Sequence, residues 1–150
     1  MTETETPAQR FFNRFYRANR ALGGLLEAAI ARDLNLEMRD FMVLSSIVKG
    51  HRHPGEIANR LHASKFTVSR ALQKLGERGL VERTIDPDDS RRVLLEPTPQ
   101  GLQTREAAIS AMEESLEPLL ESLGPDHTDN LITALELITE NLTEVRSTDT

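Results

Sequence analysis

Cysteine is absent from the 150-residue chain, which excludes a disulfide framework, a thiolate nucleophile and a cysteine-based redox switch. Tryptophan is also absent, and aromatic residues make up only 4% of the chain. The core must therefore be built mainly from Leu, Ile and Ala, and it is modest for an isolated monomer. We expect such a chain to complete its core in an oligomer.

Long apolar runs are missing as well, since none approaches the roughly 20 residues that cross a bilayer. The acidic start MTETETP lacks the basic residues of a signal peptide. We therefore expect a soluble, cytoplasmic protein with no membrane partner.

The motifs of the common enzyme classes are missing too. The chain has no Gly-rich phosphate loop, no HExxH motif and no Ser/His/Asp order typical of hydrolases. The glutamates of the C-terminal third lie opposite apolar stripes and read as a solvated helix face. We predict that the protein is not an enzyme and needs no cofactor.

Charge is distributed unevenly along the chain. The formal net charge of −6 divides into 0 for residues 1–48, +4 for residues 49–92 and −10 for residues 93–150. Such asymmetry indicates one surface that attracts a polyanion and another that repels it, although solvated helix faces alone could produce it.

The basic central segment contains the most informative stretch, SKFTVSRALQKLGERG at residues 64–79. Its apolar residues Val68, Ala71, Leu72 and Leu75 recur at helical spacing and predict a face turned toward a core. The other side carries cations and short hydroxyl side chains, which suit DNA phosphates and base edges. Ser64 is placed to cap the helix, and Gly79 to end it.

The flanking segments complete a helix-turn-helix outline. Helices are predicted at about 37–49 and from Pro54, with His62 and Ala63 forming the turn before Ser64. After Gly79, two β-rich runs flank the turn formers of residues 86–90 and predict a hairpin. Thr98 and Pro99 then begin another helix, as cap and first residue.

Three long helical segments surround this unit. Residues 7–34 carry apolar residues on more than one face, and two further stripes run through residues 109–123 and 131–145. Both stripes are typical of coiled-coil-like packing. The length of the first helix, roughly 40 Å at ~1.5 Å per residue, indicates contact with a second subunit.

The order of these elements resembles the MarR family of bacterial winged-helix regulators across about residues 8–146. The resemblance is carried by IANRLHASKFTVSRALQKLGERGLVER, by DPDDSRR and by the step Thr98-Pro99-Gln100-Gly101. The expected fold is mainly α with a small β-hairpin wing, that is, a winged helix-turn-helix plus a helical dimerisation layer. In the single chain of residues 1–150, residues 36–98 would bind DNA, whereas 7–34 and 99–146 would form a homodimer.

The resemblance implies a sequence-specific transcriptional regulator, expected to be a ligand-responsive repressor on a pseudo-palindromic operator in double-stranded DNA. The helix would enter a major groove, and the DNA contacts implied there are Ser64, Lys65, Thr67, Ser69, Arg70 and Lys74. In the hairpin, Arg91 or Arg92 would enter the minor groove, with Asp89 supporting the tip. Ser90 stands where the family often has Arg, so the choice between these arginines stays open.

A small aromatic or phenolic effector is a further expectation, bound between the dimer helices and the winged helix. Residues that could line its pocket are Phe12, Tyr16, Arg20, Phe41 and Met42. Interface core is the competing interpretation for each aromatic residue taken alone.

Three questions stay open at this stage. Phe66 is bulkier than expected, and packing against the preceding helix is favoured over contact with a thymine methyl. His51 and His53, near Glu56, allow a metal-responsive regulator as an alternative, although we predict no metal site. The net acidity allows a second alternative, a winged-helix module that binds proteins.

Overall fold

The computed structural model describes residues 5–148, with side-chain surroundings defined up to residue 142. The chain divides into two compact units, Met1–Met112 and Glu113–Thr150. Helix α5 (Pro99–Leu123) passes through the boundary between them. The predicted division into a DNA-binding and a dimerisation part is a functional one and stays a prediction.

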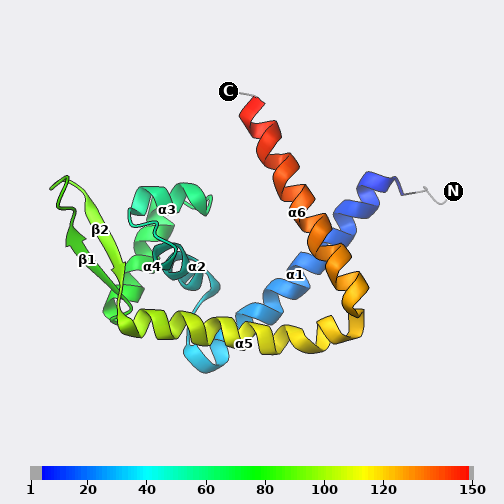
Figure 1. The fold of residues 1–150 in the computed structure, drawn as a ribbon, viewed down its shortest axis with the longest axis horizontal. Coiled ribbons are helices and arrows are strands. Elements are labelled where there is room, and N and C mark those ends of the chain that lie inside the picture. The colour runs from blue at the N-terminus through cyan, green and yellow to red at the C-terminus, as the bar shows by residue number, and fades with distance from the viewer. Residues whose placement is uncertain (1–4, 149–150) are drawn as a thin grey trace. The chain divides into compact units, whose positions relative to one another are not determined.

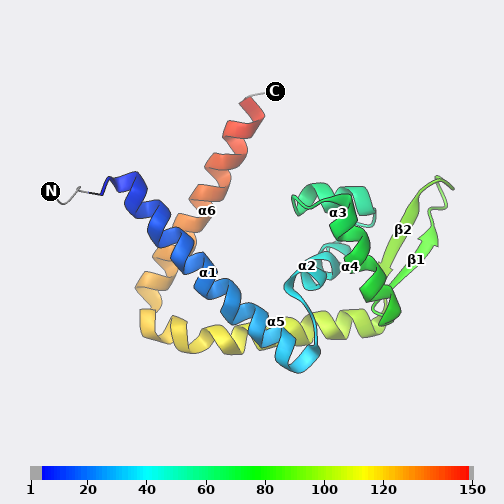
Figure 2. The same cartoon turned by 180° about the vertical axis from the view of Figure 1, so that it is seen from behind.

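The first unit begins with a 28-residue helix, α1 (Pro7–Leu34), which Thr6 caps in a capping box with Gln9. It ends at Asn35, whose left-handed backbone (φ 47°) turns the chain into the next helix. Helices α2 (Met38–Val48), α3 (Pro54–Arg60) and α4 (Lys65–Glu77) follow. In both views of the ribbon these three short helices lie together, with the hairpin beside α4 (Figures 1 and 2).

The hairpin pairs β1 (Val81–Ile85) with β2 (Val93–Pro97) as antiparallel strands. The register runs from Val81 opposite Pro97 to Ile85 opposite Val93. The Leu95 amide also donates to the carbonyl of Arg52, at 2.9 Å, and so ties the second strand to the loop before α3.

The core of the first unit lies among α2, α3, α4 and the hairpin. Its fully buried side chains include Leu44, Ile57, Leu75 and Leu95. The four apolar residues of the 64–79 stretch, Val68, Ala71, Leu72 and Leu75, are all buried, as their spacing predicted. The mainly helical fold with a β-hairpin wing is therefore confirmed.

Helix α5 starts against the end of α4. The Thr98 hydroxyl accepts from the Gly101 amide at 3.0 Å and donates to the Gly79 carbonyl at 2.6 Å. Gly101 lies so close to the chain that an added Cβ would stand 2.0 Å from the Leu80 carbonyl oxygen. Only glycine fits here, which explains the step from Thr98 to Gly101 in packing terms.

The second unit contains the end of α5 and helix α6 (Pro125–Thr148), joined at Gly124. Large apolar side chains of this unit are exposed in the single chain, among them Leu131, Leu135 and Leu142. No helix within residues 5–148 is long and apolar enough to cross a membrane.

Candidate nucleic-acid interface

The N-terminal half of α4, residues 65–70, presents the polar face expected to meet DNA. Ser64 caps the helix by accepting from the Thr67 amide at 3.0 Å. Lys65, Ser69 and Arg70 are exposed, and Thr67 is half-buried beside the cap. The structure thus brings five of the six predicted contacts on this helix onto its first two turns.

Phe66 does not pack against the preceding helix, and that interpretation is wrong. Its side chain is 71% exposed, which places it outside the core. The guanidinium carbon of Arg70 lies 5.9 Å from the centroid of its ring. This i, i+4 arrangement is a cation–π contact along one helix face.

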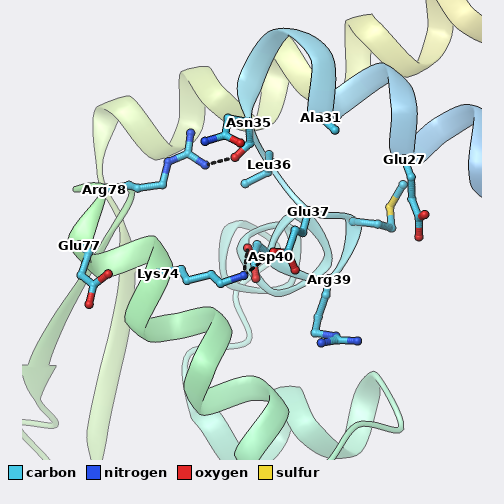
Figure 3. Close-up of a pocket in the computed structure, with 11 residues that line it drawn as sticks. Glu27, Ala31, Asn35, Leu36, Glu37, Arg39, Asp40, Lys74, Glu77 and Arg78 are labelled. Atoms are coloured by element: carbon cyan, nitrogen blue, oxygen red, sulfur yellow. Dashed lines mark hydrogen bonds and ion pairs between the residues drawn. The ribbon is translucent and has the colours of Figure 1, made fainter.

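Lys74, the sixth predicted contact, has carboxylate partners from α2. Its ammonium donates to Glu37 at 2.5 Å and lies 3.7 Å from Asp40 (Figure 3). The hydrogen bond raises the pKa of Lys74 and lowers the pKa of Glu37. Burial raises the pKa of Asp40, although the nearby ammonium opposes this shift. A phosphate would therefore have to compete with these carboxylates, and the contact predicted for Lys74 stays a prediction.

Arg78, at the C-cap of α4, is exposed but also bonds the backbone of its own chain. Its guanidinium donates to the carbonyl of Asn35 at 2.9 Å (Figure 3). It also donates to the carbonyl of Leu34 at 2.9 Å. These carbonyls are left free where α1 ends. Arg78, Lys74 and the start of α2 line a cavity of about 600 Å³.

The hairpin tip, residues 86–92, is organised by two aspartates. Asp89 accepts from the Arg91 amide at 3.0 Å through its carboxylate. Asp86 is only 8% exposed and accepts from the Asp88 amide at 2.9 Å. The Nε2 atom of His53 lies 3.6 Å from the other Asp86 oxygen.

The two candidate minor-groove residues, Arg91 and Arg92, are both exposed at this tip. Their backbones are held by Asp89, since the Arg92 amide also donates to the Asp89 carbonyl at 2.9 Å. Arg91 and Arg92 are therefore equivalent candidates for the minor-groove contact.

The histidines considered as metal ligands are engaged separately. His51 bonds Glu56 at 2.5 Å, which lowers the pKa of that carboxyl, whereas His53 bonds the Val93 carbonyl at 3.1 Å. Across the part of the chain that the structure describes, no three His, Asp or Glu side chains are grouped to hold a metal ion.

The residues expected to line an effector pocket lie on α1 and α2 of the described part of the chain. Phe12 and Tyr16 stack at 6.2 Å on α1, and their side chains are 64% and 56% exposed. Arg20 lies exposed one turn further along. On α2, Phe41 is buried in the core and Met42 is exposed. Their predicted role in lining an effector pocket stays a prediction.

Sequence reasoning missed the parts played by Glu37, Asp86 and Arg78. Asp86 was read only as a turn former, although it is the buried anchor of the hairpin. The free carbonyls at the end of α1 signal that a cation should lie nearby. No periodicity or motif in the sequence identifies Arg78, at the C-terminal end of α4, as this cation.

Comparison with known proteins agrees with this geometry. The sequence model of the MarR family matches residues 34–92. The chain is 30% identical over 105 residues to the uncharacterized HTH-type transcriptional regulator YdgG of Bacillus subtilis. That match covers 69% of this chain and 68% of YdgG.

Solved structures of regulators share the fold. BldR from Sulfolobus solfataricus superposes with a TM-score of 0.78 at 23% identity, covering 94% of this chain and 99% of BldR. A MarR mutant from E. coli complexed with operator DNA gives 0.74 at 24% identity, covering 86% and 93%. CouR from Rhodococcus jostii, bound to p-coumaroyl-CoA, gives 0.75 at 21% identity, covering 95% of each chain.

Three observations agree: the relatives are HTH-type transcriptional regulators, the family model matches residues 34–92, and α4 exposes a cationic face within a winged helix-turn-helix. The chain belongs to the MarR family of DNA-binding transcriptional regulators.

Proposed function

We propose that the protein is a ligand-responsive repressor that acts in the cytoplasm and binds a pseudo-palindromic operator as a homodimer. The observation that carries the DNA-binding part is the exposure of Lys65, Ser69 and Arg70 on one face of α4. Their charges and hydroxyl groups suit phosphates and base edges in a major groove. The E. coli MarR mutant complexed with operator DNA supports this use of the shared fold.

The wing contributes a second contact in this proposal. Arg91 or Arg92 enters the minor groove, where a narrow groove focuses negative potential. Asp89 and the buried Asp86 hold the backbone of the tip that carries both arginines. Residues 36–98 thereby act as the DNA-binding part.

Dimerisation is supported by the apolar side chains that one chain leaves exposed. In α1 these include Phe11 and Phe15, and in the second unit Leu131, Leu135 and Leu142. A group of exposed large apolar side chains marks an interaction site in a soluble protein. The charges are also complementary, because residues 7–26 carry four Arg and no acidic side chain, whereas residues 113–142 carry eight acidic side chains and no Lys or Arg. Residues 7–34 and 99–146 thus form the dimerisation part.

The effector in this proposal is a small aromatic or phenolic acid or its thioester. CouR bound to p-coumaroyl-CoA supports the ligand class. The stacked pair Phe12 and Tyr16 offers aromatic surface, and Arg20 offers a charge for a carboxylate. In this proposal, the exposed Met42 and the largely buried Phe41 would complete the pocket from the winged helix of the dimer. Ligand binding would favour a spacing of the two α4 helices that no longer fits DNA.

The DNA-binding and dimer proposals are tested together by selecting duplexes from a random pool with the full-length protein. An inverted repeat with half-sites roughly 34 Å apart is expected, the spacing of one helical turn. Light scattering should show a dimer, and Leu135→Asp should abolish both the dimer and DNA binding. Thr133→Asp, on the polar side of the same helix, is the matched control and should change neither.

A monomer that binds the selected duplex as well as the dimer would contradict the dimer proposal. Selection of no sequence at all would instead favour the protein-interaction alternative. For the effector, p-coumaric acid and p-coumaroyl-CoA should raise the melting temperature and release the duplex. Arg20→Gln should weaken the response to both compounds, and an unchanged response would remove Arg20 from the site.

A further inference from the structure

Phe66 occupies an unusual place for a large apolar residue. It is the second residue of α4 and is 71% exposed, whereas the core of the winged helix is completed by Val68, Ala71 and Leu72 on the other side of the helix. A single exposed apolar residue needs no explanation by itself. Its position at the start of the helix that carries the cationic face is what gives it meaning.

The ring of Phe66 is coupled to the residue best suited to read a base. The Arg70 guanidinium carbon lies 5.9 Å from the ring centroid, one helical turn further along. Phe66, Thr67 and Arg70 also line a groove of about 180 Å³, whose lining includes Glu37 and Asp40 of the α2 region. The aromatic face therefore restricts the guanidinium to the region beside itself, which lowers the entropy lost when Arg70 binds.

Arg70 differs in this respect from the next cation along the helix. Lys74 is paired with Glu37 and Asp40, whereas no hydrogen bond or ion pair joins the Arg70 side chain to any side chain described in residues 5–142. Its five N–H donors stay available for the O6 and N7 acceptors of a guanine.

The apolar counterpart in a major groove is the C5-methyl group of thymine, which is the only methyl group there. We propose that Phe66 is a specificity-determining residue that contacts a thymine methyl one or two base-pair steps from the guanine read by Arg70. Base pairs are stacked about 3.4 Å apart, so the 5.9 Å between ring and guanidinium spans one to two base-pair steps. The inference rests on the proposed DNA binding and adds to it a thymine requirement within two base pairs of the guanine.

The requirement is tested with the inverted repeat selected from the random pool. Each thymine of the half-site is replaced in turn by deoxyuridine, symmetrically in both halves. Deoxyuridine removes the methyl group and leaves every hydrogen-bonding group in place. The protein should lose affinity at one position by roughly fourfold per half-site, the value of one methyl group returned to water.

Two variants assign that loss to Phe66. Phe66→Ala should bind the thymine and deoxyuridine duplexes equally, whereas Phe66→Leu keeps apolar contact and should retain most of the discrimination. Both variants should melt within a few degrees of the unchanged protein, because the side chain is exposed. Arg70→Ala should keep the methyl effect but lose the preference for the adjacent guanine.

The outcomes separate the two levels of the proposal. Equal affinity of the unchanged protein for all deoxyuridine duplexes would overturn the role of Phe66, as would full discrimination by Phe66→Ala. If no duplex is selected at all, the proposed DNA binding fails and this inference fails with it.

Discussion

The two halves of α4 carry cations of the same kind but use them differently. In the N-terminal half, residues 65–70, Lys65 and Arg70 are exposed, and the Arg70 guanidinium lies over the ring of Phe66. The C-terminal half, residues 71–77, is joined with its Arg78 cap to the rest of the unit. There Lys74 bonds Glu37, and Arg78 bonds the carbonyls that end α1.

The difference arises from what each half of the helix lies against. The start of α2 supplies carboxylates beside Lys74 (Figure 3), and the end of α1 supplies carbonyls to Arg78. Among the residues whose side chains the structure describes, no carboxylate bonds the Lys65 or Arg70 side chain in the first two turns. One end of α4 is thus held in place while the other is free to meet a ligand. A cation on a recognition helix serves DNA only where its own chain leaves it available.

The largest expected effect comes from loosening the held end. In Gly101→Ala, the new methyl group would stand 2.0 Å from the Leu80 carbonyl oxygen, directly after α4. Because backbone must move to admit it, the cost should reach or exceed the top of the roughly 1–3 kcal/mol range for overpacking. Chemical denaturation measures it, with the exposed neighbour Gln100→Ala as control. A loss below about 1 kcal/mol would show that α5 does not hold the end of α4 as described.

Arg78→Ala should have the next largest effect. It removes two hydrogen bonds to carbonyls of Leu34 and Asn35, and about 1–2 kcal/mol of unfolding free energy is expected after allowance for exposure. Arg78→Lys can keep one of the two hydrogen bonds, so its free energy of unfolding should lie between those of Arg78→Ala and the unchanged protein. DNA affinity of the folded variant should change little. If Arg78→Ala is as stable as the unchanged protein but binds DNA much more weakly, Arg78 belongs with the proposed DNA-contacting cations Lys65 and Arg70.

Ser64→Ala tests the free end. The hydroxyl satisfies the Thr67 amide at the N-terminus of α4, and its loss should cost about 1 kcal/mol in thermal or denaturant unfolding. Ser64→Asn supplies another capping side chain and should restore most of the stability. Equal stability of all three proteins would mean that the cap contributes nothing.

The smallest expected effect is a dependence on pH at the held end. Burial raises the pKa of Asp40 in the folded protein, so its carboxyl contributes stability below its unfolded pKa and loses that contribution as pH rises through the folded pKa. Asp40→Asn stays neutral. Its melting temperature relative to the unchanged protein should therefore increase as pH rises across the acidic range. A decrease over that range would mean that the attraction to Lys74 outweighs burial.

Much of this architecture follows from local patterns in the sequence. Val68, Ala71, Leu72 and Leu75 are buried as their spacing predicted, Ser64 caps α4, and Thr98 caps α5. These features depend on residues within a few positions of one another, where helical periodicity and capping rules apply.

The rest depends on contacts between distant residues. Lys74 and Glu37 are 37 positions apart, and no periodicity in either helix says that their side chains meet. Phe66 was misplaced for a related reason, because an apolar residue is by default assigned to a core. Its exposure depends on how α4 lies against its neighbours, and Asp86 at the hairpin was overlooked in the same way.

The most direct test of the division within α4 compares Arg70→Ala with Lys74→Ala. Dissociation constants for the selected duplex and for an unrelated duplex are measured at one salt concentration, together with melting temperatures. Arg70→Ala should lose about 1–3 kcal/mol on the selected duplex alone and melt unchanged. Lys74→Ala should melt lower, and any loss of affinity from the phosphate contact predicted for Lys74 should be the same on both duplexes. Equal loss of DNA affinity in the two variants, with no change in melting of Lys74→Ala, would contradict the division.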